Sequence, residues 1–260
     1  MNKPKGNVLV ITEGTTEKVI MEKLFTTFGF SEKFVYHSYG TNLYPLFNAL
    51  SKEQDRDNWD ILLLLRSKES NPEKQRILNL HFAEIIMVFD FDPHDPQYSD
   101  EKIIVMTEYF NDSSEMGKLY INYPMAEAFY HMKNVPDNDF YNYVVRTEDL
   151  KAYKSFVQKD FQADHRKFAT NKNELGTITR QNIDKAWYIL NRIPEPLPPS
   201  QNEILSKQAR CREIAVLCTC VFYVTDFNRT LAPNLELDQC EIISPKGSAN
   251  LVINAKESQK

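Results

Sequence analysis

The sequence is poor in glycine, cysteine and histidine, and it has no excess of positive charge. Its 260 residues include 7 Gly, 4 Cys and 5 His, and the formal net charge is −5 at pH 7. So few glycines exclude a glycine-rich repeat architecture. Proteins that grip nucleic acid over a wide face are often basic, because counterion release drives that binding. The acidic total argues mildly against such a partner, although an acidic metal site can coexist with a local basic patch.

The four cysteines do not have the spacing of a zinc site. Cys218 and Cys220 are separated by one residue, and no histidine follows His165, which matches zinc-ligand spacings poorly. The apolar run that ends at Thr12 is too short for a signal peptide, and the one at 218–223 is too short to span a bilayer. We therefore expect reduced thiols in a cytoplasmic protein that has no contact with a membrane.

Two short, almost uninterrupted apolar runs are the clearest structural pattern. Asn7–Thr12 and Glu84–Asp90 are rich in aliphatic residues, which is typical of strands buried on both faces of a parallel sheet. Lys33–Ser38 and Lys118–Tyr123 are further strand candidates, and helical spacing of apolar residues recurs between and after these runs. This alternation predicts an α/β fold of βαβ units with right-handed crossovers.

The chain divides by pattern into two regions. Residues 1–135 are predicted as the α/β domain, and residues 51–82 within it as a helical insertion with highly charged flanks. In that insertion, Ile61–Leu65 fits either a strand or a buried helix. Residues 136–260 are predicted as a mostly α-helical region with a rigid proline-rich linker at Pro194–Pro199. Helices are expected there over Asp149–Phe161, Asn182–Arg192 and Asn202–Tyr223.

Three carboxylates follow the two clearest strands. Glu13 lies one residue past the first, Asp90 ends the second, and Asp92 comes two residues later. Ligands of open α/β sheets bind outside the carboxyl ends of the strands, and residues two apart in an extended chain project to the same side. Converging carboxylates repel one another unless a cation neutralises them. The pattern predicts a site for a hard divalent cation, Mg²⁺ or Mn²⁺.

Each of these residues also has an ordinary structural interpretation. A lone Asp after a strand is commonly a cap or a turn former, and an acid in the first turn of a helix is favoured by the helix dipole. The combination is more specific than its parts. Glu13-Gly14 follows one strand and Asp90-x-Asp92 follows another strand of the same predicted sheet.

These motifs resemble those of the TOPRIM domain. The resemblance rests on Val10-Ile11-Thr12-Glu13-Gly14, the Gly40 turn and Val88-Phe89-Asp90-Phe91-Asp92, and it extends over residues 5–135. TOPRIM domains occur in topoisomerases, bacterial primases, OLD-family nucleases, ribosomal-RNA maturases and several anti-phage effectors. The resemblance implies a TOPRIM-like parallel sheet flanked by helices. It also implies that Glu13 acts as a general acid/base or metal ligand and that Asp90 and Asp92 hold Mg²⁺.

Further acids form a weaker tier of candidate ligands. Glu17 lies one helical turn after Glu13, and Glu127 follows the last predicted strand. OLD-type nucleases use extra acids in this way, in a two-metal arrangement, but solvated helix acids explain both residues equally well. Asp95 extends the acidic loop. His94 could position a water or a phosphate, although a loop histidine is more often simply exposed.

Local basic patches supply weak candidates for nucleic-acid binding. They are Lys133, Arg166, Lys167 and Arg180, with aromatic residues interleaved nearby. Ordinary solvated helix faces explain these residues better. The aromatic-rich second region also offers surfaces on which copies of the chain could pair as a homo-oligomer.

Three functions from different classes fit the sequence. The first is a metal-dependent nuclease acting on DNA or RNA, resembling the stand-alone TOPRIM effectors of bacterial anti-phage defence, such as RloB-like proteins or the PARIS effector. The second is a haloacid-dehalogenase-like phosphatase with Asp90 as nucleophile. Against it, the motif is not on the first strand, and His94 stands where that family has a small hydroxyl or β-branched residue. The third is a non-catalytic TOPRIM-fold module that docks onto an ATPase partner. The sequence favours the nuclease.

Overall fold

A five-stranded sheet forms the centre of the computed structural model, which describes residues 6–53, 55–164, 166–168, 170–227 and 251–252. The strand order is β2-β1-β3-β5-β4. Four strands are parallel, and the short β4 pairs antiparallel with β5. The predicted α/β class is confirmed, and the sheet is parallel, as predicted, except for β4. The strands are β1 (Asn7–Thr12), β2 (Lys33–Ser38), β3 (Phe82–Asp90), β4 (Asn111–Asp112) and β5 (Gly117–Asn122).

The two central strands owe their positions to their apolar runs. Val8–Ile11 of β1 and Ile86–Phe89 of β3 are almost fully buried, as expected for parallel strands covered on both faces. Thr12 is in register with Val88, and Asp90 with Asn122. Because these strands are parallel, their carboxyl ends lie at one edge of the sheet, which we call the carboxyl edge.

Helices cover both faces of this sheet. On one face, Phe25 of α1 meets Tyr223 edge-on, with ring centroids 5.5 Å apart. On the other face, α2 and α5 pack against each other. The chain from Arg56 to Leu78 forms three short helices. The Ile61–Leu65 run lies in the second of them, which Asp60 caps by accepting the N–H of Leu63. The helices of this half are α1 (Thr15–Phe28), α2 (Leu43–Glu53), η1 (Arg56–Asn58), α3 (Ile61–Lys68), α4 (Pro72–Leu78) and α5 (Asp100–Tyr109).

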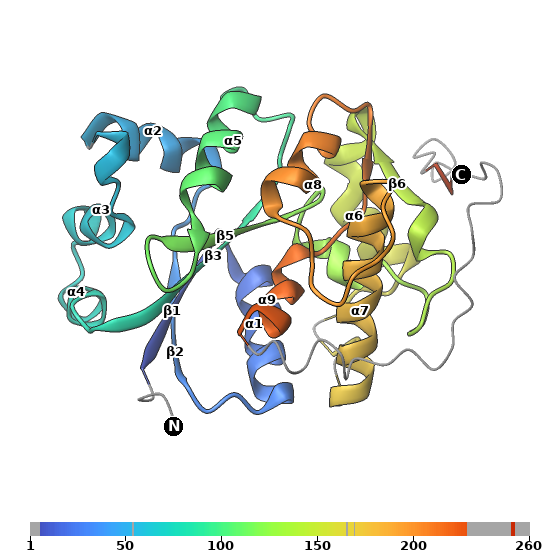
Figure 1. Cartoon of the computed structure of the whole chain (residues 1–260), viewed down its shortest axis with the longest axis horizontal. Coiled ribbons are helices and arrows are strands. Elements are labelled where there is room, and N and C mark those ends of the chain that lie inside the picture. The colour runs from blue at the N-terminus through green and yellow to red at the C-terminus, as the bar shows by residue number, and fades with distance from the viewer. Residues whose placement is uncertain (1–5, 54, 165, 169, 228–250, 253–260) are drawn as a thin grey trace.

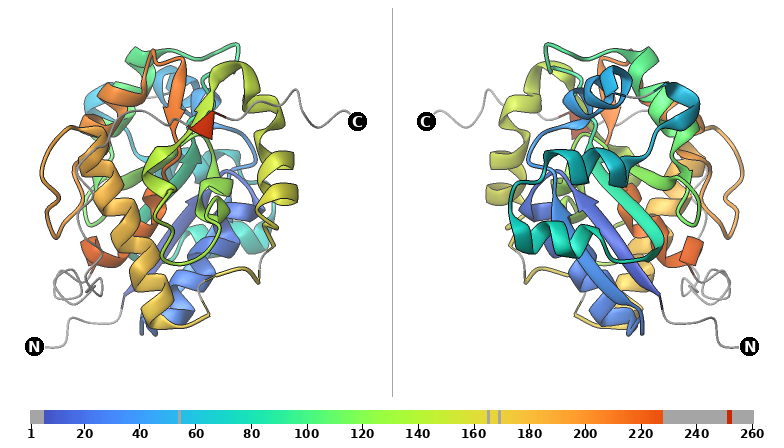
Figure 2. Two further views of the ribbon diagram at one scale, coloured as in Figure 1. Left: turned by 90° about the vertical axis from the view of Figure 1, so that its right-hand side faces the viewer. Right: turned by 90° about the vertical axis from the view of Figure 1, so that its left-hand side faces the viewer.

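The second half combines helices with a small sheet of order β7-β6-β8. Its long helices α6 and α7 lie on the opposite side of the molecule from α3 and α4 (Figure 1), and the two views of Figure 2 face these two sides in turn. Among the described residues, no helix has the length and apolar character needed to cross a bilayer. The elements are η2 (Ala126–Tyr130), η3 (Phe140–Asn142), β6 (Tyr143–Arg146), η4 (Thr147–Asp149), α6 (Leu150–Asp160), α7 (Lys172–Ile189), α8 (Gln201–Gln208), β7 (Glu213–Ala215), η5 (Thr219–Phe222), α9 (Tyr223–Phe227) and β8 (Leu251–Val252).

The predicted long helix over Asn202–Tyr223 is wrong. Helix α8 ends at Gln208, whose side-chain amide bonds to both the N–H and the carbonyl of Ala215, at 3.0 and 2.9 Å. Arg210 adopts a left-handed φ of 62°. The chain thereby turns back and pairs β7 with β6. Local apolar spacing could not predict this turn, because contacts with distant residues decide it.

Helix α7 begins well before the predicted Asn182. Asn171 caps it by accepting the N–H of Glu174 at 2.9 Å. Its buried face carries polar side chains, including Gln181 and Lys185, so the apolar periodicity that marks most helices is weak here.

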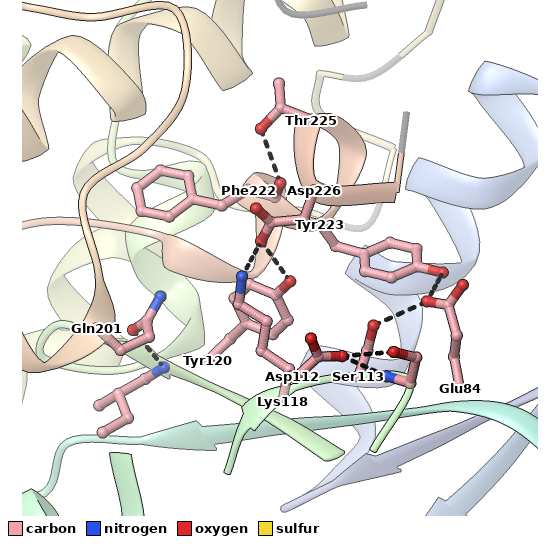
Figure 3. A network of polar contacts seen from close by, with 12 residues as sticks. Glu84, Asp112, Ser113, Lys118, Tyr120, Gln201, Phe222, Tyr223, Thr225 and Asp226 are labelled. Atoms are coloured by element: carbon pink, nitrogen blue, oxygen red, sulfur yellow. Dashed lines mark hydrogen bonds and ion pairs between the residues drawn. The ribbon is translucent and has the colours of Figure 1, made fainter. Parts of the chain in front are cut away.

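Polar contacts tie helix α9 to the central sheet (Figure 3). The carboxylate of Asp226 accepts from the ammonium of Lys118 at 2.6 Å and from the hydroxyl of Tyr120 at 2.7 Å. The hydroxyl of Tyr223 donates to Glu84 at 3.2 Å. Both halves of the chain contribute side chains to one hydrophobic core.

Candidate functional site

Glu13 is held at the carboxyl edge by its backbone. Its N–H donates to the carbonyl of Val88 at 3.1 Å, and its own carbonyl accepts from Gly40 at 3.1 Å. Gly40 has a φ of 79°, a left-handed conformation that favours glycine. The carboxylate of Glu13 lies against the end of β3, where it accepts a long hydrogen bond of 3.4 Å from the N–H of Asp90. The first two predicted ligands therefore lie side by side.

Asp90 and Asp92 are close in the chain but differ in environment. One carboxylate oxygen of Asp90 accepts the N–H of Ala126 at 2.9 Å, which joins the end of β3 to the start of η2. Asp92 has a left-handed φ of 40°, so the extended geometry assumed for this pair does not continue to Asp92. Its carboxylate lies 4.0 Å from the ring of His94. The turn, rather than the pleat of a strand, directs the side chain of Asp92.

The three carboxylates share a strongly unfavourable electrostatic environment. Burial, followed by the charge of Asp92, raises the pKa of Glu13 to about 7. Burial also holds the pKa of Asp90 well above its ordinary value, with further increases from Glu17 and Glu13. Burial raises the pKa of Asp92 as well, against the opposing influence of His94. All three acids are thus closer to their neutral forms than free side chains would be.

The weaker acidic candidates surround this group, and each has a structural partner. Glu17 accepts the N–H of Gly14 at 2.8 Å, as in a helix-capping interaction. Glu127 is 6% exposed and accepts from the ammonium of Lys154 at 2.8 Å. Asp95 accepts from the side chain of Asn42 at 2.6 Å and from the N–H of Gln97 at 2.7 Å.

No local pattern in the sequence marks Lys154 as a site residue. It lies on α6, in the second half of the chain, and attraction by Glu127 raises its pKa. Glu17 and Asp90 attract it as well. Sequence spacing contains no signal for this contact, because α6 reaches Glu127 only through the tertiary fold.

The donor chemistry of the carboxyl edge fits a hard divalent cation, because Mg²⁺ and Mn²⁺ prefer carboxylate oxygens. The geometry is not closed around one point. Within the described residues, no group of three or more His, Cys, Asp or Glu side chains is arranged to hold a metal ion. Binding a cation here would therefore require rotation of side chains such as Glu13 and Asp92.

Two of the weak nucleic-acid candidates are exposed and paired locally. Lys133 forms an ion pair of 2.9 Å with Asp139. Arg166 forms one of 3.1 Å with Asp164. Both side chains are accessible to a phosphate, which would have to compete with these carboxylates.

The other two candidates, Lys167 and Arg180, donate hydrogen bonds to backbone carbonyls of the fold. The ammonium of Lys167 donates to the backbone carbonyls of Tyr130 and Met132 at 3.3 and 2.8 Å, and its burial lowers its pKa to about 8. Arg180 is buried, and it pairs with Asp184 and donates to two backbone carbonyls of the proline-rich linker. These contacts occupy both side chains, and the phosphate-binding role stays a prediction.

Comparison of the chain with protein-family models, with curated proteins and with solved structures found no match. The TOPRIM resemblance therefore stays a prediction from the motifs around Glu13 and Asp90.

Proposed function

We propose that this chain is a metal-dependent nuclease that hydrolyses phosphodiester bonds of DNA or RNA. The crowding of Glu13, Asp90 and Asp92 at the carboxyl edge carries the proposal. Buried carboxylates at this spacing destabilise one another, and a divalent cation would offset that cost. When bound, such a cation supplies Lewis-acid activation and lowers the pKa of a bound water.

The residues of the chain would divide the remaining tasks. Glu13, whose carboxylate accepts the N–H of Asp90, is the proposed acid–base residue. Asp90 and Asp92 are the proposed metal ligands, with Glu17 and Glu127 as outer acids. The exposed cations Lys133 and Arg166 are available to flanking phosphates.

Cleavage assays test this proposal directly. The purified protein is incubated with Mg²⁺ or Mn²⁺ and with plasmid, single-stranded DNA or tRNA. We expect metal-dependent cleavage that falls by at least about 100-fold in Glu13→Ala and Asp90→Asn, the scale of a lost acid–base group. Glu115→Gln, an exposed acid on a loop, serves as the matched control and should retain activity. Absence of cleavage, or cleavage unchanged in both variants, would refute the proposal.

Two observations favour a second function, a non-catalytic interaction module. The described acids do not close around an ion, and the carboxylate of Glu127 already has Lys154 as a counter-ion. If this alternative is correct, calorimetry at pH 8 will detect no binding of Mg²⁺ or Mn²⁺. Trapping of Asp90 with beryllofluoride would indicate the phosphatase instead of either.

A further inference from the structure

A narrow crevice opens next to the acids of the carboxyl edge. It lies between the first turns of α1, the helix η2 and the last turns of α6, and its volume is about 180 Å³. Glu127 forms part of its wall, and the preceding residue, Ala126, donates its N–H to Asp90 at 2.9 Å. A molecule in the crevice would therefore lie near the end of β3, which carries Asp90.

The lining of the crevice combines apolar surface with hydrogen-bonding groups. Val19, Ala163 and the ring of Tyr130 supply the apolar part. The hydroxyls of Thr15 and Thr16 and the amide of Gln158 supply polar groups that can both donate and accept. A nucleobase has this combination, because its faces stack on apolar and aromatic groups while its edges form hydrogen bonds.

The size of the crevice restricts what can enter it. Pockets for drug-sized ligands have volumes of about 300–1,000 Å³, so about 180 Å³ suits one planar base and not a base pair. Asp164 also lines an adjoining hollow of about 560 Å³, whose wall contains the cations Lys133, Arg166 and Lys167 and the carboxylates Asp160 and Asp164. A strand leaving the crevice would thus pass a wall on which positive side chains outnumber negative ones.

We infer that the crevice binds a single nucleobase next to the cleaved bond, so that the substrate is single-stranded DNA or RNA, or an unpaired strand end, and not an intact duplex. The inference deepens the proposed nuclease function and rests on it. Gln158 and Thr16 are the proposed base-binding residues on opposite walls. Lys154 pairs with Glu127 at 2.8 Å and so offsets the charge of one of the two carboxylates in the lining, Glu127 and Asp164.

Binding measurements without turnover test the inference. Labelled single-stranded DNA, RNA of the same sequence and the matching DNA duplex are titrated with protein by fluorescence anisotropy, with Ca²⁺ in place of Mg²⁺. Gln158→Trp fills the crevice from α6, and Thr16→Phe fills it from α1. Lys159→Trp, at the neighbouring exposed position of α6, is the matched control. Thermal melts verify that each variant is folded.

We expect the wild type to bind at least one single strand about tenfold or more tightly than the duplex. Gln158→Trp and Thr16→Phe should weaken single-strand binding by about tenfold, the effect of losing one stacked base, whereas Lys159→Trp should not. The inference is overturned if the duplex binds as tightly, if both filled variants bind like the wild type, or if no strand binds. Single-strand binding that is lost in the filled variants, without cleavage in Mg²⁺, would refute the nuclease function but support the subsite.

Discussion

Replacing Glu13 by glutamine should stabilise the fold at neutral and alkaline pH, although it removes the proposed acid–base residue. Below pH 4.5, Glu13 is protonated in both the folded and the unfolded chain, so the substitution changes little. As the pH rises from 4.5 to about 7, the unfolded chain releases this proton while the folded chain retains it. Stability of the wild type therefore falls over this range. The glutamine variant has no such proton to lose.

The size of the effect follows from the pKa of Glu13. A rise from the ordinary 4.5 to about 7 corresponds to at most about 3 kcal/mol of unfolding free energy. Glutamine keeps an oxygen that can accept the N–H of Asp90, but it is also costly to bury. We therefore expect a gain of about 1–3 kcal/mol at pH 8, or about 2–12 °C in Tm for a chain of this size.

Thermal and urea unfolding at pH 4.5, 6 and 8, without divalent cations, measure this gain. The difference between Glu13→Gln and the wild type should be small at pH 4.5 and largest at pH 8. Glu115→Gln, at an exposed position, should show no such trend. If Glu13→Gln follows the pH profile of the wild type or is less stable than the wild type at pH 8, burial beside the other acids does not destabilise the ionised form of Glu13.

The remaining predictions concern the cation and the two halves of the chain. Mg²⁺ should raise Tm at pH 8 but not at pH 5, because protons compete for the carboxylates at the lower pH. At pH 8, a Mg²⁺ concentration of 100 times Kd would add about 2.7 kcal/mol to the free energy of unfolding. A shift in Tm of equal size at both pH values would contradict this. Lys154→Gln should lower the urea-derived unfolding free energy by about 1–2 kcal/mol because Glu127 loses its counter-ion. The control Lys151→Gln, on the same helix, should not lower it. Equal losses in the two variants would contradict the role of the Lys154–Glu127 pair. Arg180→Ala should lower the free energy of unfolding, measured in urea, by about 3–5 kcal/mol because Asp184 is left buried and unpaired. A loss below about 1 kcal/mol would show that the Arg180–Asp184 pair does not stabilise the fold.

Much of the sheet could be predicted from local sequence. The runs around Leu9 and Met87 are apolar and short, and such runs are stable only where both faces are covered. Once these strands are parallel, chain direction alone brings Glu13 and Asp90 to the same edge. The position of Glu13 and Asp90 at the ends of two parallel strands was therefore enough to predict that they lie close together.

The sequence by itself determined the parallel sheet, the edge that Glu13 and Asp90 share, and the acidity of that edge. Only the tertiary structure decided that Glu127 is neutralised by Lys154 from α6 and that Arg180 faces inward. It also decided where α8 ends and where the crevice opens between α1 and α6. The physical reason is that periodicity and turn chemistry are properties of neighbouring residues. Ion pairs, buried charges and crevices bring together residues that are far apart in the chain, and no regular sequence spacing predicts which residues these are.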